Sequence, residues 1–127
     1  MNWRWVDRRA LELLHGESIA EHGGAPGLRD EGLLESALAR PLNLVAYGKP
    51  DALDLAAAYG VGLAKNHAFV DGNKRVAFLA VGMFLALNGQ RLVASQAEAT
   101  LTMLAVAAGT LDEAALATWL RGHVKAR

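Results

Sequence analysis

Long segments with a helical spacing of apolar residues alternate along this chain with short breaks rich in glycine, proline or aspartate. Almost nothing shows the period of two that is typical of a half-buried strand. The pattern therefore predicts an all-α fold, a compact bundle of about six helices. The predicted helices cover residues 7–21, 30–40, 51–67, 74–87, 95–109 and 112–127.

Residues that can cap a helix set most of these boundaries. Asp7, Asp30 and Asp51 precede the first three helices, and SQAE at 95–98 has the spacing of a capping box. The segment PLNLVAYGKP at 41–50 has two prolines, an asparagine and a glycine. It therefore predicts an irregular connection with a short extended piece. The helix 74–87 is apolar on nearly every side, which favours a place in the middle of the bundle.

Composition narrows the class of protein. A chain of 127 residues with 53% hydrophobic content can bury a real core, and we expect a single domain over residues 1–127. Thirteen basic residues balance thirteen acidic ones, so no broad basic face is available for nucleic acid, although a local cluster could bind one phosphate group. No cysteine is present, the N-terminus lacks the apolar core of a signal peptide, and the apolar run 76–87 is too short to cross a bilayer. The simplest interpretation is a cytoplasmic protein with no membrane role.

Polar chemistry is concentrated in NHAFVDGNKR, residues 66–75, where the fourth helix begins. Lys74 and Arg75 lie in its first turn, where the helix dipole disfavours cations, so an anionic partner is expected there. A helix N-terminus beside a glycine loop binds phosphate well, and Arg75 adds a planar fork that matches phosphate oxygens. Asp71 is the kind of single carboxylate that binds Mg²⁺ together with substrate phosphates, and Asn73 could assist it.

His67, four residues before Asp71, is the candidate general base, because an imidazole can accept a proton near neutral pH. Phe69 between them is expected to turn inward and anchor the loop. A structural interpretation exists for each residue taken singly: Asp71 as a helix cap, Lys74 and Arg75 as solvated surface charges. Only their concentration in one segment favours a metal-nucleotide site.

The motif HAFVDGNKR resembles the signature of the Fic/Doc superfamily: His, any residue, Phe, any residue, Asp or Glu, Gly or Ala, Asn, Gly or Lys, Arg. Lys74 stands where the AMP-transferring Fic enzymes have glycine, which makes the chain similar to the death-on-curing (Doc) toxins. EHGGAPGLRD at 21–30 and NGQRL at 88–92 also look Doc-like. Two positions depart from one branch of the superfamily or the other. Ala68 stands where Fic enzymes usually have proline, and Gly72 stands where a Doc toxin can have alanine.

The resemblance implies a Fic-type fold and a toxin of a type II toxin-antitoxin system. Such a toxin is a protein kinase that transfers the γ-phosphoryl group of ATP to a threonine of elongation factor Tu and blocks translation. It further implies His67 as base, Asp71 as Mg²⁺ ligand, and Gly72, Asn73, Lys74 and Arg75 as the nucleotide-binding residues. A Phd-type antitoxin would be the partner, and residues 43–49 would form a flap that receives the target peptide as an added strand.

Two alternatives stay open: AMP transfer to a protein hydroxyl, and a catalytically inactive module that binds an antitoxin. Lys74 matters for the first, because a bulky cation would fill the space that lets Fic enzymes bring the α-phosphate in line. Of the remaining residues, Trp3 and Trp5 are expected to pack the N-terminus against the bundle. His15, His22 and His123 lack partners at metal-ligand spacing, and we interpret all three as structural.

Overall fold

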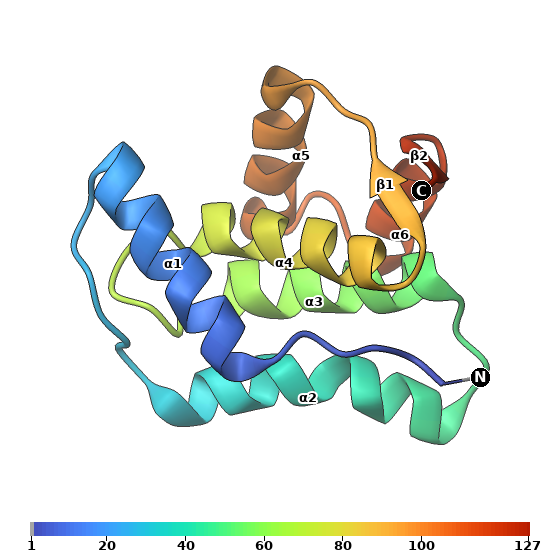
Figure 1. Ribbon diagram of the computed structural model, residues 1–127, viewed down its shortest axis with the longest axis horizontal. Coiled ribbons are helices and arrows are strands. Elements are labelled where there is room, and N and C mark those ends of the chain that lie inside the picture. Colours follow the sequence, from blue (N-terminus) through green and yellow to red (C-terminus); the bar gives the residue numbers. More distant parts are fainter. Residues whose placement is uncertain (1) are drawn as a thin grey trace.

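The computed structural model describes residues 2–127. Within this part of the chain, six helices and one small antiparallel sheet form the fold (Figure 1), so the predicted all-α class is confirmed. The elements are α1 (Arg8–His22), α2 (Glu31–Tyr47), α3 (Ala52–Asn66), α4 (Asn73–Leu87), β1 (Gln90–Leu92), α5 (Gln96–Ala108), α6 (Glu113–Arg121) and β2 (Val124–Ala126).

Side-chain caps start five of the six helices in residues 2–127, as the sequence predicts. Each of these residues accepts a hydrogen bond from a backbone N–H of the first turn: Asp7, Asp30, Asp51, Ser95 and Asp112. Each such cap stabilises its helix by about 1 kcal/mol. The exception is α4, whose N-cap residue is Gly72 and provides no side-chain bond.

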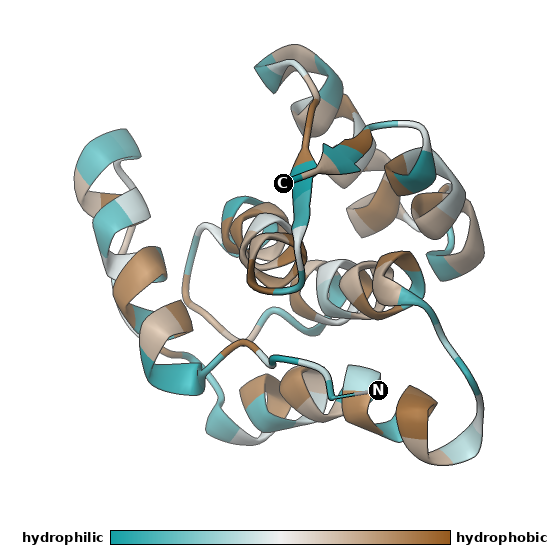
Figure 2. Cartoon of the chain, turned by 45° about the vertical axis from the view of Figure 1, so that its right-hand side comes forward, coloured by the Kyte–Doolittle hydropathy of each residue, from teal (hydrophilic) through white to brown (hydrophobic). Residues whose placement is uncertain are grey.

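The most buried helix is α3, not the expected helix at 74–87. All its residues except Asp54, Lys65 and Asn66 are buried, and it contacts α2, α4, α5 and α6. Alanine and glycine allow this close packing: a Cβ at Gly62 would lie 3.3 Å from the Cα of Ala37 in α2. Figure 2 shows the hydrophobic residues gathered on the helices in the middle of the molecule. Apolar composition alone does not separate α3 from α4, because α4 keeps one side half exposed.

The prediction of an irregular connection at 41–50 is wrong, because α2 continues through Pro41 to Tyr47. A proline inside a helix loses one backbone hydrogen bond and costs about 3 kcal/mol. Here Leu34, Ala37 and Pro41 are all buried on one face, and α2 packs along α3. Burial of this face offsets the cost, and a local sequence pattern does not contain that information.

The prediction that the last helix runs to the C-terminus is also wrong. It ends at Arg121, and β2 then pairs with β1, with Arg91 opposite Lys125. Arg127 adds two hydrogen bonds between the C-terminus and the end of α4. Its backbone N–H donates to the Gly89 carbonyl at 3.0 Å, and its guanidinium donates to the Ala86 carbonyl at 3.1 Å. Strands of three residues are too short to show a period of two.

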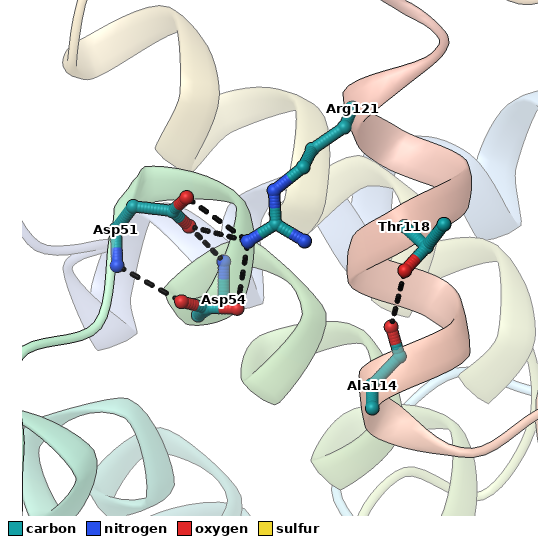
Figure 3. Close-up of polar contacts among 5 residues, drawn as sticks. All are labelled: Asp51, Asp54, Ala114, Thr118 and Arg121. Carbon is teal, nitrogen blue, oxygen red and sulfur yellow. Dashed lines mark hydrogen bonds and ion pairs between the residues drawn. The ribbon is translucent and has the colours of Figure 1, made fainter.

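Arg121 joins α6 to the first turn of α3 (Figure 3). Its guanidinium donates to both carboxylate oxygens of Asp51, at 3.1 and 2.9 Å, and to Asp54 at 3.0 Å. Partial burial opposes the charged form of Asp51, but the Asp54 N–H and the Arg121 charge outweigh it and lower the pKa of Asp51. These groups stay half exposed, so the pairs contribute at most about 1 kcal/mol each.

The N-terminal segment packs as expected. The rings of Trp3 and Trp5 lie with their centroids 6.1 and 5.9 Å from that of Phe84 in α4. Across residues 2–127, no helix has the length and apolar character needed to cross a membrane.

Candidate active site

The polar segment predicted from the sequence forms the junction between α3 and α4. The loop 67–72 lies beside α1 and the segment 23–30 that follows it (Figure 1). Three backbone hydrogen bonds join the loop to that segment: Val70 N–H donates to the Gly27 carbonyl at 3.0 Å, and the Ala68 carbonyl accepts from Arg29 N–H at 2.7 Å and from Asp30 N–H at 3.0 Å. The site is therefore assembled from segments that are distant in sequence.

His67 ends α3 in the left-handed conformation, with φ 52° and ψ 47°. It is the one non-glycine residue with positive φ among residues 2–127, and its side chain is exposed. Its carbonyl accepts a hydrogen bond of 2.7 Å from Arg29 Nε, and a second Arg29 nitrogen donates to Asn66 at 3.4 Å. Arg29 thus holds the backbone that carries the candidate base, while the imidazole stays accessible.

Asn73 closes the loop on itself. Its Oδ1 accepts from the Phe69 N–H and its Nδ2 donates to the Phe69 carbonyl, both at 3.0 Å, and the side chain is buried. The expected inward turn of Phe69 is confirmed, because only 2% of the residue is exposed. The side chain of Asn73 therefore shapes the loop, and its backbone N–H is the group available to a ligand.

Asp71 carries an exposed carboxylate with a defined orientation. Oδ1 accepts from the Gly72 N–H at 2.8 Å and Oδ2 accepts from the Ala25 N–H at 3.2 Å. These two bonds, with the nearby charge of Arg75, lower the pKa of Asp71, so the group is anionic at neutral pH. Each oxygen accepts one protein hydrogen bond and can accept a further ligand, and the residue is exposed.

The donor set fits Mg²⁺ bound through a substrate. Within residues 2–127, no group of three or more histidine and carboxylate side chains could hold a metal ion. Mg²⁺ commonly binds one or two carboxylates and completes its octahedron with waters and phosphate oxygens. Asp71 matches that mode and not an all-protein cage.

The N-terminus of α4 offers an anion several unused donors. Gly72 adopts φ 73° and provides no cap, and the N–H groups of residues 73–75 find no acceptor in the described chain. Lys74 and Arg75 are exposed, and neither forms an ion pair within residues 2–127. Two free cations beside open N–H groups make a strong anion-binding position.

His15 belongs to this site, although the sequence favours a structural role. It is 3% exposed on the buried face of α1, its ring stacks on Phe69 with centroids 3.9 Å apart, and its Nε2 lies 2.7 Å from the Asp71 carbonyl oxygen. Sequence reasoning also missed Arg29. A histidine among the apolar positions 11, 15 and 19 of an amphipathic helix is the signal that could have marked His15.

The expected flap at residues 43–49 is wrong. The segment 43–47 is helical, and α2 begins beside Ala68 and then runs away from the loop for 17 residues, about 25 Å. Figure 1 shows the end of α2 at the opposite side of the molecule from the α3–α4 loop. No peptide added along residues 43–49 would reach His67.

A separate groove of about 730 Å³ runs along the half-exposed side of α4. Phe78, Leu79 and Met83 of α4 line it, together with Arg4 and Arg127. It is mostly apolar with basic residues from the two termini.

Comparison with known proteins decides the family. The model of the Fic/DOC family matches residues 5–85, which include α1, α2, α3 and the whole loop 67–72. The chain belongs to the Fic/DOC family. The matched region contains both the motif HAFVDGNKR and the segments around His15 and Arg29 that hold it.

Two Fic/DOC relatives cover most of the chain. It is 35% identical over 119 residues to "Protein kinase doc" of Escherichia phage P1, an alignment that covers 93% of this chain and 94% of that protein. It is 47% identical over 93 residues to "Toxin Doc" of Mycolicibacterium smegmatis, covering 71% of this chain and 68% of that protein. The similarity places the chain with Doc toxins within the Fic/DOC family.

Proposed function

We propose that this protein is the toxin of a type II toxin-antitoxin system and a protein kinase. Its substrate would be ATP with Mg²⁺, and the γ-phosphoryl group would go to a threonine hydroxyl of elongation factor Tu, blocking translation in the cytoplasm. The observation that carries the proposal is one junction that presents an exposed imidazole, an anionic carboxylate and an uncapped helix N-terminus with two free cations. The name of the phage P1 relative supports the choice of a kinase.

In this reaction, the hydroxyl oxygen forms a bond to the γ-phosphorus while the bond from that phosphorus to the bridging oxygen breaks and ADP leaves. His67 takes the hydroxyl proton, and its exposed position at the end of α3 gives a protein substrate access. Bound Mg²⁺ would neutralise charge on the phosphate oxygens. Asp71 would hold the ion, while Lys74, Arg75 and the open N–H groups of residues 73–75 would orient the phosphates.

AMP transfer by the same site is the alternative within the enzyme class. It differs in which phosphorus lies in line with the attacking hydroxyl. Lys74 is exposed at the first turn of α4, where glycine would leave room for a different placement of the nucleotide. This position favours the kinase interpretation.

A Phd-type antitoxin is the partner that we propose for the toxin. The apolar groove on α4 suits one face of an amphipathic helix, and its basic residues Arg4 and Arg127 favour a helix with acidic flanks. A catalytically inactive protein that only binds such a partner is the alternative from another class. Nucleotide turnover separates it from both enzymes.

Intact-mass analysis of elongation factor Tu, incubated with this protein and Mg·ATP, tests the proposal. We expect one added phosphate with the wild type and none with His67→Ala, whose loss of the base lowers transfer by roughly 10²- to 10⁴-fold. An added adenylate would replace the kinase with AMP transfer. No adduct on any protein of a bacterial lysate would reject both enzymes.

Measurements of ATP binding by His67→Ala and Arg75→Ala test which residue serves transfer and which serves nucleotide binding. His67→Ala should keep the affinity for ATP, because the imidazole contacts the acceptor hydroxyl and not the phosphates. Arg75→Ala should weaken ATP binding as well as transfer. Full activity of His67→Ala would remove the assignment of the base.

A further inference from the structure

One side chain holds the backbone of Asp71 from outside the motif. His15 Nε2 lies 2.7 Å from the Asp71 carbonyl oxygen, and the carbonyl can only accept, so this nitrogen carries the proton and donates. No backbone N–H in residues 2–127 reaches that carbonyl. His15 is therefore its one protein donor in the described chain.

The same histidine also packs against the loop 67–72. Its ring stacks on Phe69 at an interplanar angle of 18°, and a Cβ added to Gly72 would lie 3.7 Å from its Nε2. Gly72 in turn donates to one carboxylate oxygen of Asp71. Phe69 and Gly72, on either side of Asp71 in the sequence, thus both lie against the imidazole of His15.

Packing alone does not account for a histidine at this position. Leu11 and Ile19 fill the same face of α1 with apolar groups, and an apolar ring at position 15 would also cover Phe69. Burying a polar ring costs free energy unless its donor is satisfied. What the histidine adds over a phenylalanine is the hydrogen bond to the Asp71 carbonyl.

We propose that His15 is a positioning residue that holds the Asp71 carboxylate in the orientation needed for the Mg·ATP complex. The inference rests on the function proposed above, since it assumes that Asp71 binds the metal with the nucleotide. His15 fixes the carbonyl, while Ala25 and Gly72 fix the carboxylate, and together they leave Asp71 few rotamers.

Two variants separate the donor from the ring. His15→Phe keeps an aromatic ring against Phe69 without the donor, and His15→Gln keeps an N–H at a similar reach without the ring. Ser18→Ala is the matched control, because Ser18 lies one turn further along the same buried face and its hydroxyl has no partner in residues 2–127. Asp71→Asn gives the reference for loss of the metal ligand.

Calorimetry of ATP binding, with Mg²⁺ and with EDTA, gives the factor by which the metal tightens binding. His15→Phe should lower this factor roughly fivefold, the effect of about one lost hydrogen bond, whereas His15→Gln and Ser18→Ala should stay within about twofold of the wild type. A wild-type factor in folded His15→Phe would overturn the inference. If His15→Phe does not fold, loss of the factor in folded His15→Gln would overturn it, and retention would support it.

Amide hydrogen exchange tests the same idea without ligand, so that failure of the inference can be told from failure of the proposed function. The N–H groups of Ala25 and Gly72 should exchange roughly fivefold faster in His15→Phe and unchanged in Ser18→Ala. Unchanged exchange in His15→Phe would overturn the positioning role. A wild type that binds ATP equally with and without Mg²⁺ would instead reject the metal site, and with it the purpose assigned to His15.

Discussion

Replacing Gly24 by alanine should damage the candidate active site from a position outside the motif. A Cβ on Gly24 would lie 2.8 Å from the carboxylate oxygen Oδ2 of Asp71 and 3.0 Å from the terminal carbon of Ile19. An ordinary contact needs about 3.5 Å, so the carboxylate must move by at least roughly half an ångström. That movement breaks the bond from Ala25 N–H, which holds Oδ2 at 3.2 Å.

The backbone adds a separate cost. Gly24 has φ 115°, a conformation that costs a residue with a side chain roughly 1–3 kcal/mol. Gly23 is a matched control, because it has φ 86° and a Cβ there would meet nothing within 4 Å. Gly23→Ala should therefore lower the free energy of unfolding by a similar amount without moving Asp71.

Transfer of phosphate at saturating and at limiting Mg²⁺ distinguishes the two variants, with thermal unfolding measured beside it. We expect Gly24→Ala to lose roughly a hundredfold in transfer rate, the scale expected when a ligand is displaced, and Gly23→Ala to stay within about threefold of the wild type. Equal activities of the two variants would refute the argument that contact with Gly24 sets the carboxylate position.

Three further outcomes follow from the structure. Arg29→Met, which loses the donor to the His67 carbonyl, should lower kcat roughly tenfold with little change in KM for ATP, measured by steady-state kinetics. Lys74→Gly should shift the product on the target protein from phosphate toward adenylate, visible as the mass of the adduct. The hydrogen bond to the Trp119 carbonyl raises the pKa of His123, so its contribution to stability is full below about pH 6.5 and is lost as pH rises through the folded value. The difference in Tm between wild type and His123→Gln should therefore be larger at pH 6 than at pH 9.

A specific result would contradict each of these three predictions. A higher KM with unchanged kcat in Arg29→Met would mean that Arg29 binds nucleotide and does not position the base. An exclusively phosphorylated product from Lys74→Gly would remove Lys74 as the determinant of reaction type. A Tm difference that does not change with pH would show that the charge of His123 does not stabilise the fold.

Helix starts could be predicted from the sequence because their causes are local. Asp51 and Ser95 each bond an N–H three residues ahead, and both capping boxes are present. The motif 67–75 was likewise visible as a cluster, since its residues are adjacent in sequence. These features need no knowledge of the tertiary structure.

The failures share a non-local cause. The helix passes through Pro41 because of packing against α3, and β1 exists because residues 124–126 fold back to it. His15 and Arg29 join the site across 56 and 38 residues of chain. No spacing rule links such pairs. The motif itself could therefore be predicted from the sequence, but the distant residues that hold it could not.

The dependence of Asp71 on α1 has a consequence for how activity can be lost. α1 contacts α4 and contributes few residues to the core, among them Leu11 and Ile19. If α1 separates from the bundle, the loop loses its supports at His15 and Ala25 while the α2–α3–α4 core keeps its own packing. Detachment of this one helix would thus stop the proposed transfer without unfolding the protein. A molecule whose binding favours the attached or the detached state of α1 would then control the candidate active site without contacting it.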